Sequence, residues 1–101
     1  MAGPLDGVRI IDLTTMASGP LATSILADQG ADVIKIEGPG RGDGLRTIGP
    51  SRGGMSAIFT SFNRNKRAMV LDLREPDGVA VLDRLVAGAD VLVQNFRPGA
   101  V

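Results

Sequence analysis

Residues 8–37, VRIIDLTTMASGPLATSILADQGADVIKIE, contain the pattern that decides the fold. Residues 8–13 are rich in β-branched side chains, which predicts a buried strand. Pro20 suits the first turn of a helix, because its missing N–H would be unpaired there, and Gly30 marks the end of that helix. Residues 32–37 alternate with period two and predict a second strand, which completes a β-α-β unit. One face of the predicted helix carries larger apolar side chains, Leu21, Ile25 and Leu26.

The rest of the sequence repeats this alternation of strand and helix. Residues 38–54 hold seven glycines, two prolines and three arginines, which predicts a long mobile loop with little burial. The elements predicted after it are one or two helical turns over 55–62, a strand over 68–73, a helix from Pro76 to Gly88 with an apolar stripe, and a strand over 91–93. The sequence therefore predicts an α/β fold, with a Rossmann-like parallel sheet, flanking helices and ligands at the carboxyl ends of the strands.

Composition narrows the classes of function. A chain of 101 residues with 44% hydrophobic content is enough for one small folded domain. Eleven basic residues balance eleven acidic ones, so we expect no general binding to nucleic acid or to anionic membranes. Neither cysteine nor histidine occurs, which excludes disulfides, thiolate metal sites and histidine catalysis within the chain. We expect a soluble, cytoplasmic protein without a targeting leader.

Three segments are candidates for binding an anion. The turn over 14–20 joins a strand to a helix N-terminus, where free N–H groups favour phosphate, although it lacks a G-x-G-x-x-G motif and a P-loop lysine. The glycine-rich stretch over 38–44 is more typical of a flexible connector in which Arg41 and Arg46 are solvated. Residues 63–67 carry three cations that either clamp phosphates or form a solvated turn. For each segment, a purely structural role without a bound anion remains an alternative interpretation.

Residues near the strand ends offer two further candidates. Asp12, Asp72 and Asp90 lie where a carboxylate can be catalytic, but capping of a turn or pairing with a cation is the favoured interpretation. Phe96 and Arg97 follow the last strand, where they either sandwich a purine and bind a phosphate or belong to the core. The residues alone therefore predict a Rossmann-like domain for an anionic ligand, with a nucleotide as the candidate.

Several separated segments resemble one known family. They are residues 4–13 (PLDGVRIIDL), 18–20 (SGP), 26–37 (LADQGADVIKIE), 62–67 (FNRNKR), 71–73 (LDL) and 89–99 (ADVLVQNFRPG). In order and spacing they are similar to the opening of class III CoA-transferases, the CaiB/BaiF family, such as formyl-CoA transferase. The resemblance spans nearly the whole chain. It implies that residues 1–101 are the N-terminal part of a large CoA-binding domain, with the remainder of the enzyme absent.

The resemblance also implies where coenzyme A (CoA) binds. The residues that match the family's CoA contacts are Met16, Ala17, Ser18, Leu71, Asp72, Leu73, Arg74, Asn95, Phe96 and Arg97. One departure is Gly38, because family members often carry an arginine directly after the second strand; Arg41 is a possible substitute. The family binds acyl-CoA and a carboxylic acid as substrates, holds no tightly bound cofactor and forms an interlocked homodimer.

The reaction that the resemblance implies needs a residue from elsewhere. Family members transfer CoA from an acyl-CoA to a carboxylic acid through an aspartyl intermediate. The catalytic aspartate of the family matches no residue in this chain, so we assign no catalytic residue and no metal ligand here and expect the fragment alone to be inactive. Two alternatives stay open: an α-methylacyl-CoA racemase-like isomerase of the same fold, and a stand-alone nucleotide- or CoA-binding module.

Overall fold

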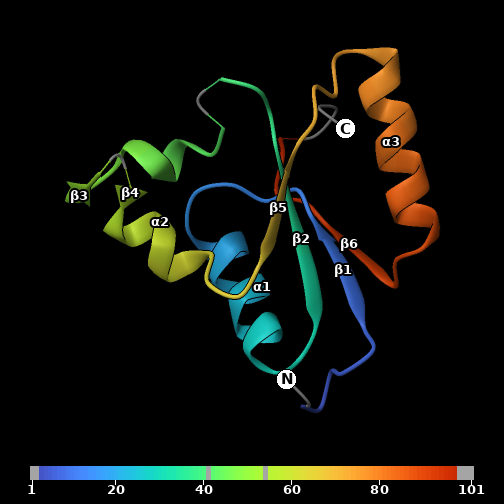
Figure 1. The fold of residues 1–101 in the computed structure, drawn as a ribbon, viewed down its shortest axis with the longest axis horizontal. Coiled ribbons are helices and arrows are strands. Elements are labelled where there is room, and N and C mark those ends of the chain that lie inside the picture. Colours follow the sequence, from blue (N-terminus) through green and yellow to red (C-terminus); the bar gives the residue numbers. More distant parts are fainter. Residues whose placement is uncertain (1–2, 41, 54, 98–101) are drawn as a thin grey trace.

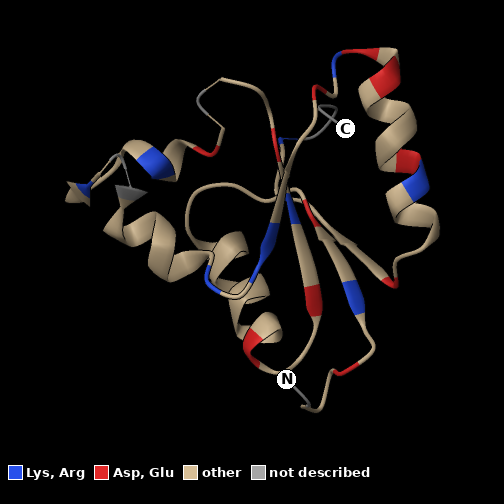
Figure 2. Ribbon diagram, viewed as in Figure 1, with Lys and Arg blue, Asp and Glu red and all other residues tan. Residues whose placement is uncertain are grey.

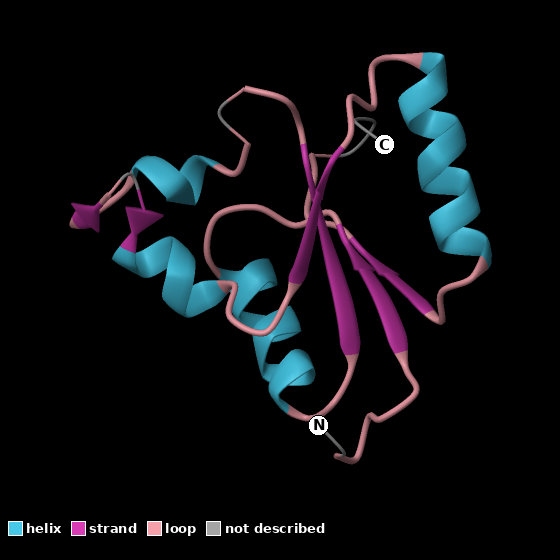
Figure 3. Cartoon of the chain, in the orientation of Figure 1, coloured by secondary structure: helices cyan, strands magenta, loops and turns pink. Residues whose placement is uncertain are grey.

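The structure is a computed structural model that describes residues 3–40, 42–53 and 55–97. Arg41 of the glycine-rich stretch, and Pro98 and Gly99 of the last turn, lie outside the described residues. The elements in chain order are β1 (Arg9–Asp12), α1 (Ser18–Asp28), β2 (Asp32–Glu37), the 3₁₀ helix η1 (Gly44–Thr47), β3 (Ser51–Arg52), β4 (Met55–Ser56), α2 (Ala57–Phe62), β5 (Arg67–Val70), α3 (Pro76–Ala87) and β6 (Val91–Val93) (Figures 1 and 3).

Four of the strands form one sheet in the order β5-β2-β1-β6, with every pairing parallel. Ile10 on the central strand β1 is paired with Val33 on one side and with Val91 on the other. Counted along the chain, the order is third, second, first, fourth, which is the order of the first four strands of a doubly wound sheet. The prediction of an α/β fold with a parallel sheet and flanking helices is confirmed.

Helices cover both faces of this sheet. Helices α1 and α2 lie on one face and α3 lies on the other (Figure 1). Because side chains alternate along a strand, neighbouring residues of β1 and β2 serve different cores. Ile10 and Val33 pack with Ala27 and Ala31 of the α1 side. The core on the α3 side contains Ile11, Leu13, Ile34 and Ile36, against which Leu82, Leu85 and Val86 of α3 pack.

The buried face of α1 differs from the one that the sequence predicts. Leu26 packs against the core, but Leu21 is exposed and Ile25 is 45% exposed, so the expectation of an apolar face is wrong for these two residues. The buried residues of the helix are Pro20, Thr23, Ser24 and Ala27. These small side chains let α1 approach the sheet closely, and the hydroxyl groups bond to buried partners: Thr23 Oγ1 donates to Asp12 Oδ2 and Ser24 Oγ to the Phe62 carbonyl, both at 2.8 Å.

The segment over 38–54 is more structured than a mobile loop. It contains η1 and the first strand of the small β3–β4 hairpin, and both Asp43 and Leu45 are buried. Arg46 is not merely solvated, because it forms two bonds of 2.7–2.8 Å with Glu37 and lies 3.8 Å from the centre of the Phe59 ring. Apart from Asp43, Leu45 and the half-buried Arg46, the described residues of the segment are exposed, so the expectation of little burial holds for most of it. Glycine content does not predict the charged exceptions, because it indicates backbone freedom but not the partners that ion pairing provides.

Candidate functional site

A cleft of about 350 Å³ opens at the carboxyl ends of the central strands. This is the edge at which parallel α/β sheets bind ligands. Its lining residues come from four segments: Leu13 and Thr15; Ile36, Glu37, Gly38, Pro39, Gly42 and Asp43; Leu71, Asp72, Leu73 and Arg74; and Phe96. The structure therefore brings five of the residues predicted to contact CoA, Leu71–Arg74 and Phe96, into one cleft beside Thr15.

One wall of the cleft is the segment over 71–74, which leaves the sheet after β5. The strand predicted over 68–73 is shorter, at Arg67–Val70, and the Leu71 N–H donates to the Glu37 carbonyl at 3.0 Å. The Asp72 carboxylate accepts bonds from the backbone N–H and the guanidinium of Arg74, whose side chain is 84% exposed. A β-carbon on Gly78 of α3 would lie 2.0 Å from the Asp72 carbonyl oxygen, so glycine is required for the wall to lie against the helix.

A second wall follows β6. The Asn95 side chain forms two hydrogen bonds with the Thr15 backbone: Oδ1 accepts from its N–H at 3.1 Å and Nδ2 donates to its carbonyl at 2.9 Å. Asn95 therefore ties the end of β6 to the turn after β1. Phe96 is half-buried and packs against the core on the α3 side, which confirms the core interpretation, and it also lines the cleft. Arg97 is exposed beside it.

The turn over 16–18 continues from Thr15 into α1. Met16, Ala17 and Ser18 are exposed, and they do not line the cleft itself. Met16 has a backbone φ of 70°, which is the left-handed conformation that non-glycine residues rarely adopt. Ala17 is the N-cap of α1 and provides no side-chain cap, so the first N–H groups of the helix are not capped by a side chain. The turn thus leads from Thr15 in the cleft to the start of α1, where no side chain caps the helix.

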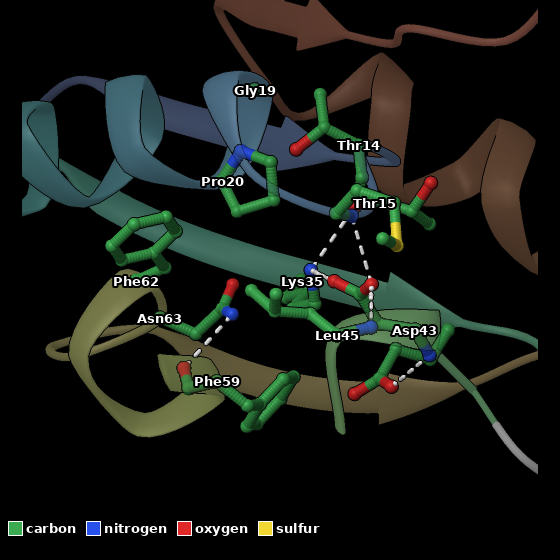
Figure 4. Close-up of polar contacts among 12 residues, drawn as sticks. Thr14, Thr15, Gly19, Pro20, Lys35, Asp43, Leu45, Phe59, Phe62 and Asn63 are labelled. Atoms are coloured by element: carbon green, nitrogen blue, oxygen red, sulfur yellow. Dashed lines mark hydrogen bonds and ion pairs between the residues drawn. The ribbon is translucent and has the colours of Figure 1, made fainter. Parts of the chain in front are cut away.

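Charged side chains buried beneath this turn hold it in place (Figure 4). Lys35 Nζ, on β2, donates to Asp43 Oδ2 at 2.9 Å and to the Thr14 carbonyl at 3.0 Å. Asp43 Oδ1 accepts from the N–H of Met16 at 2.8 Å and from that of Leu45 at 3.0 Å. The Asp43 N–H in turn donates to Glu37 Oε2 at 2.7 Å. The turn after β1 and the loop after β2 are therefore joined through side chains that are buried.

A second buried pair lies beside the first. Lys66 Nζ contacts Asp12 Oδ2 at 2.8 Å, and both side chains are almost fully buried. Asp12 also accepts the Thr14 N–H at 2.8 Å, so pairing and turn capping, the favoured interpretation of this residue, are both confirmed. Asp72 likewise pairs with Arg74, and Asp90 accepts the Arg9 N–H at 2.9 Å.

The three cations of the segment over 63–67 form ion pairs with carboxylates of this chain. Arg64 pairs with Asp28 and Arg67 with Asp32, both at the surface, whereas Lys66 is buried against Asp12. The segment therefore stabilises the fold and presents no preformed phosphate clamp. Charged residues occur within the strands themselves as well as in the loops (Figure 2). Sequence reasoning missed Lys35, Glu37 and Asp43; the only available signal was that Lys35 and Glu37 share the strand face of Val33.

The surroundings of three carboxylates shift their ionisation. For Asp12, Glu37 and Asp43, desolvation by burial is the largest single influence and raises the pKa. Hydrogen bonds and opposite charges together outweigh it, so each pKa lies below its ordinary value. The opposing groups are chiefly Lys66 for Asp12, Arg46 for Glu37, and the Leu45 N–H with Lys35 for Asp43. All three are ionised at neutral pH.

Comparison with known proteins places this geometry in a family. The sequence profile of CoA-transferase family III matches residues 5–101. The chain belongs to CoA-transferase family III. It is 48% identical over 99 residues to an acetyl-CoA:oxalate CoA-transferase of Acetobacter aceti, covering 98% of this chain and 25% of that protein. It is 47% identical over 97 residues to the human succinyl-CoA:glutarate CoA-transferase, covering 95% and 22%.

Solved structures agree with this family III assignment. A CaiB/BaiF family protein from Brucella suis superposes with a TM-score of 0.90 at 41% identity, covering 98% of this chain and 27% of that one. A protein from Mycobacterium tuberculosis gives a TM-score of 0.86 at 41% identity, with coverages of 97% and 26%. The chain thus spans about a quarter of the length of the relatives that it matches.

Two further findings concern the described residues only. None of their helices is both long and apolar enough to cross a membrane. Within residues 3–40, 42–53 and 55–97, no three acidic side chains gather in a way that would hold a metal ion.

Proposed function

We propose that this chain provides the CoA-binding part of an enzyme that transfers CoA from an acyl-CoA to a carboxylic acid. The observation that carries the proposal is the cleft at the carboxyl ends of the strands, where Leu71–Arg74 and Phe96 meet beside Thr15 in a family III chain. The nucleotide end of CoA lies against residues 16–18, 71–74 and 95–97. Relatives that carry CoA-transferase names support the reaction class.

The groups around the cleft suit the chemistry of the CoA nucleotide. Arg97 offers an exposed guanidinium group, which forms strong charge-assisted hydrogen bonds with phosphate. The Arg74 guanidinium is exposed as well and would exchange its surface pairing with Asp72 for a phosphate. The uncapped N-terminus of α1 offers backbone N–H groups and a favourable helix dipole for a phosphate group. The Phe96 ring lines the cleft and offers an apolar face for a purine base. These residues bind and orient the substrate.

The chemical step uses an aspartate that lies outside this chain. Its carboxylate attacks the thioester carbonyl, the CoA thiolate leaves, and a mixed anhydride forms. The thiolate then attacks the aspartyl carbonyl and releases the first carboxylic acid, which leaves an aspartyl-CoA thioester. The acceptor carboxylate attacks this thioester to give a second anhydride, and the thiolate completes the transfer by attacking the acceptor acyl group. Because no residue here takes the aspartate's part, the 101 residues alone are proposed to be inactive.

The proposal includes an assembly and a location. We place the enzyme in the cytoplasm, as a homodimer whose subunits interlock, with acyl-CoA and a carboxylic acid as its partners. The absence of cysteine from the sequence is compatible with a reducing compartment.

Calorimetric titration tests the CoA site. The purified protein, in the length that its gene encodes, is titrated with CoA and with NAD after circular dichroism has shown that it is folded. We expect saturable binding of CoA but not of NAD, and about tenfold weaker CoA binding in Arg97→Ala, because a charged partner of phosphate is lost.

Arg52→Ala is the matched control, since Arg52 is an exposed arginine on β3 and does not line the cleft. Its CoA affinity is expected to equal that of the parent. An equal loss of affinity in both variants would point to general charge attraction instead of a site. Binding of NAD in place of CoA would overturn the proposed function.

A further inference from the structure

Met16 adopts a conformation that its own residue type does not favour. A φ of 70° is unfavourable for a non-glycine residue, and it persists only where the surroundings impose it. The surrounding group that reaches Met16 is Asp43, 27 residues further along the chain, whose Oδ1 accepts the Met16 N–H at 2.8 Å. The strained turn is therefore held by a side chain from the loop after β2.

Asp43 is itself fixed from several sides. Its side chain has no solvent exposure, its Oδ2 is paired with Lys35 at 2.9 Å, and Oδ1 also accepts the Leu45 N–H. Lys35 contacts the same turn a second time, through the Thr14 carbonyl at 3.0 Å. Every buried side-chain nitrogen and oxygen among the described residues has a hydrogen-bond partner, so the loss of one bond in this network would leave a buried polar group unpaired.

We infer that Asp43 is a positioning residue, which sets the shape of the turn over 14–18 and thereby the affinity of the cleft for CoA. The inference rests on the proposed function, because it takes residues 16–18 as contacts of the CoA nucleotide. Asp43 is buried directly behind the cleft and holds the turn through the Met16 N–H. Because Asp43 Oδ1 accepts the N–H groups of both Met16 and Leu45, it joins the turn before α1 to the start of η1.

Two variants of nearly equal shape isolate this role. Both carry Lys35→Met, which removes the ammonium that would otherwise be buried without its partner. One then carries Asp43→Asn, whose amide oxygen can still accept the N–H groups of Met16 and Leu45, and the other carries Asp43→Leu, which cannot. We expect the leucine variant to bind CoA about tenfold more weakly than the asparagine variant.

Hydrogen exchange at the Met16 amide provides a readout that does not depend on CoA. In the absence of ligand, this amide is expected to exchange at least about tenfold faster in the leucine variant than in the asparagine variant. Exchange of the β1 amides should be equal in the two variants. Equal β1 exchange would show that the sheet is intact, and restoration of CoA affinity by asparagine separates positioning from a general loss of stability.

The outcomes distinguish this inference from the proposed function. If the parent binds CoA, Arg97→Ala weakens binding and the two Asp43 variants bind equally, the positioning role is wrong and the function stands. If Met16 exchange is equal in both variants, Asp43 does not hold the turn, and the inference is again wrong. If the folded parent binds no CoA, the proposed function is overturned, and the inference with it.

Discussion

The two faces of the sheet are built on different principles. On the α3 face, the buried side chains are apolar: Ile11 of β1, Leu13 just after it, and Ile34 and Ile36 of β2. On the α1 face, the same strands present Ile10 and Val33 near their amino ends but Asp12, Lys35 and Glu37 towards their carboxyl ends. The change from apolar to charged occurs where the loops leave the sheet, next to the cleft.

The two faces therefore contribute differently to the protein: the apolar face chiefly stabilises the fold, and the charged face fixes the conformation of the loops. Apolar burial contributes about 25 cal/mol per Å² and has no direction, so the α3 face tolerates small changes of side-chain shape. Buried charges are stable only when each one meets its partner, so the α1 face permits few arrangements of its loops. The buried ion pairs thus fix the loops beside the cleft, whereas the hydrocarbon of the α3 face provides burial and, through Leu13 and Ile36, part of the cleft lining.

The largest effect is expected on the charged face. Asp12→Asn keeps the shape of the side chain but leaves the Lys66 ammonium buried without an opposite charge, since Lys66 and Asp12 are paired at 2.8 Å. Removal of one partner from such a pair should lower the free energy of unfolding by about 3 kcal/mol or more. Urea unfolding followed by circular dichroism measures this change.

Two matched variants complete the test at Asp12. The double variant Asp12→Asn with Lys66→Met should recover part of the lost stability, because no charge then remains unpaired. Asp28→Asn removes the partner of Arg64 in a surface pair and is expected to cause no measurable change. Equal losses in Asp12→Asn and Asp28→Asn would show that burial of the pair is not what makes it important.

Acidification is expected to weaken the same buried ion pairs, with a smaller effect than the removal of one partner. The pKa values of Asp12, Glu37 and Asp43 are lowered in the folded protein, so the folded state binds fewer protons than the unfolded state. Their stabilisation is complete above the ordinary carboxyl pKa of about 4 and is lost as the pH falls through it towards the folded values. Urea unfolding at about pH 6 and about pH 4 should show lower stability at the acidic pH.

Glu37→Gln is the control for this pH dependence. It keeps the shape of the side chain but removes one of the three carboxylates, so its stability should fall less steeply with acid than that of the parent. A parent protein that becomes more stable between about pH 6 and about pH 4 would contradict the sign of these shifts.

The smallest effect is expected on the apolar face. Ile11→Val removes one methylene group from a fully buried side chain next to Asp12 in the sequence, and should cost about 1 kcal/mol. CoA affinity should be unchanged, since Ile11 faces α3 and does not line the cleft. A parallel loss of CoA affinity would mean that the two faces are coupled and that the distinction between them is wrong.

Periodicity predicts the apolar part of this fold well. Residues 32–37 form β2 as predicted, and the predicted helix from Pro76 is α3, which ends at Ala87 before its C-cap Gly88. These elements are defined by side chains close together in the sequence, which a local pattern records. The predicted end of β5 is wrong because Leu71 and Leu73 continue the apolar pattern, but they pack against the core after the strand has ended.

The charged part of the fold was not predictable in the same way. Asp43 is buried because Lys35 and Met16 lie next to it, and these residues are 8 and 27 positions away in the sequence. No periodic pattern records such pairings, so a glycine-rich composition gave the opposite expectation. The predicted CoA contacts came from family resemblance, and the structure gathers Leu71–Arg74 and Phe96 in one cleft but leaves their contact with CoA a prediction.

Gly78 has a consequence for attempts to stabilise this protein. Glycine within a helix weakens it by roughly 1 kcal/mol relative to alanine, so replacement by alanine is a common route to a more stable protein. At this position the added methyl group would meet the Asp72 carbonyl at 2.0 Å. The helix contains a weak helix former at this point because the segment over 71–74 lies directly against it, and replacement of Gly78 by alanine would displace the wall of the cleft.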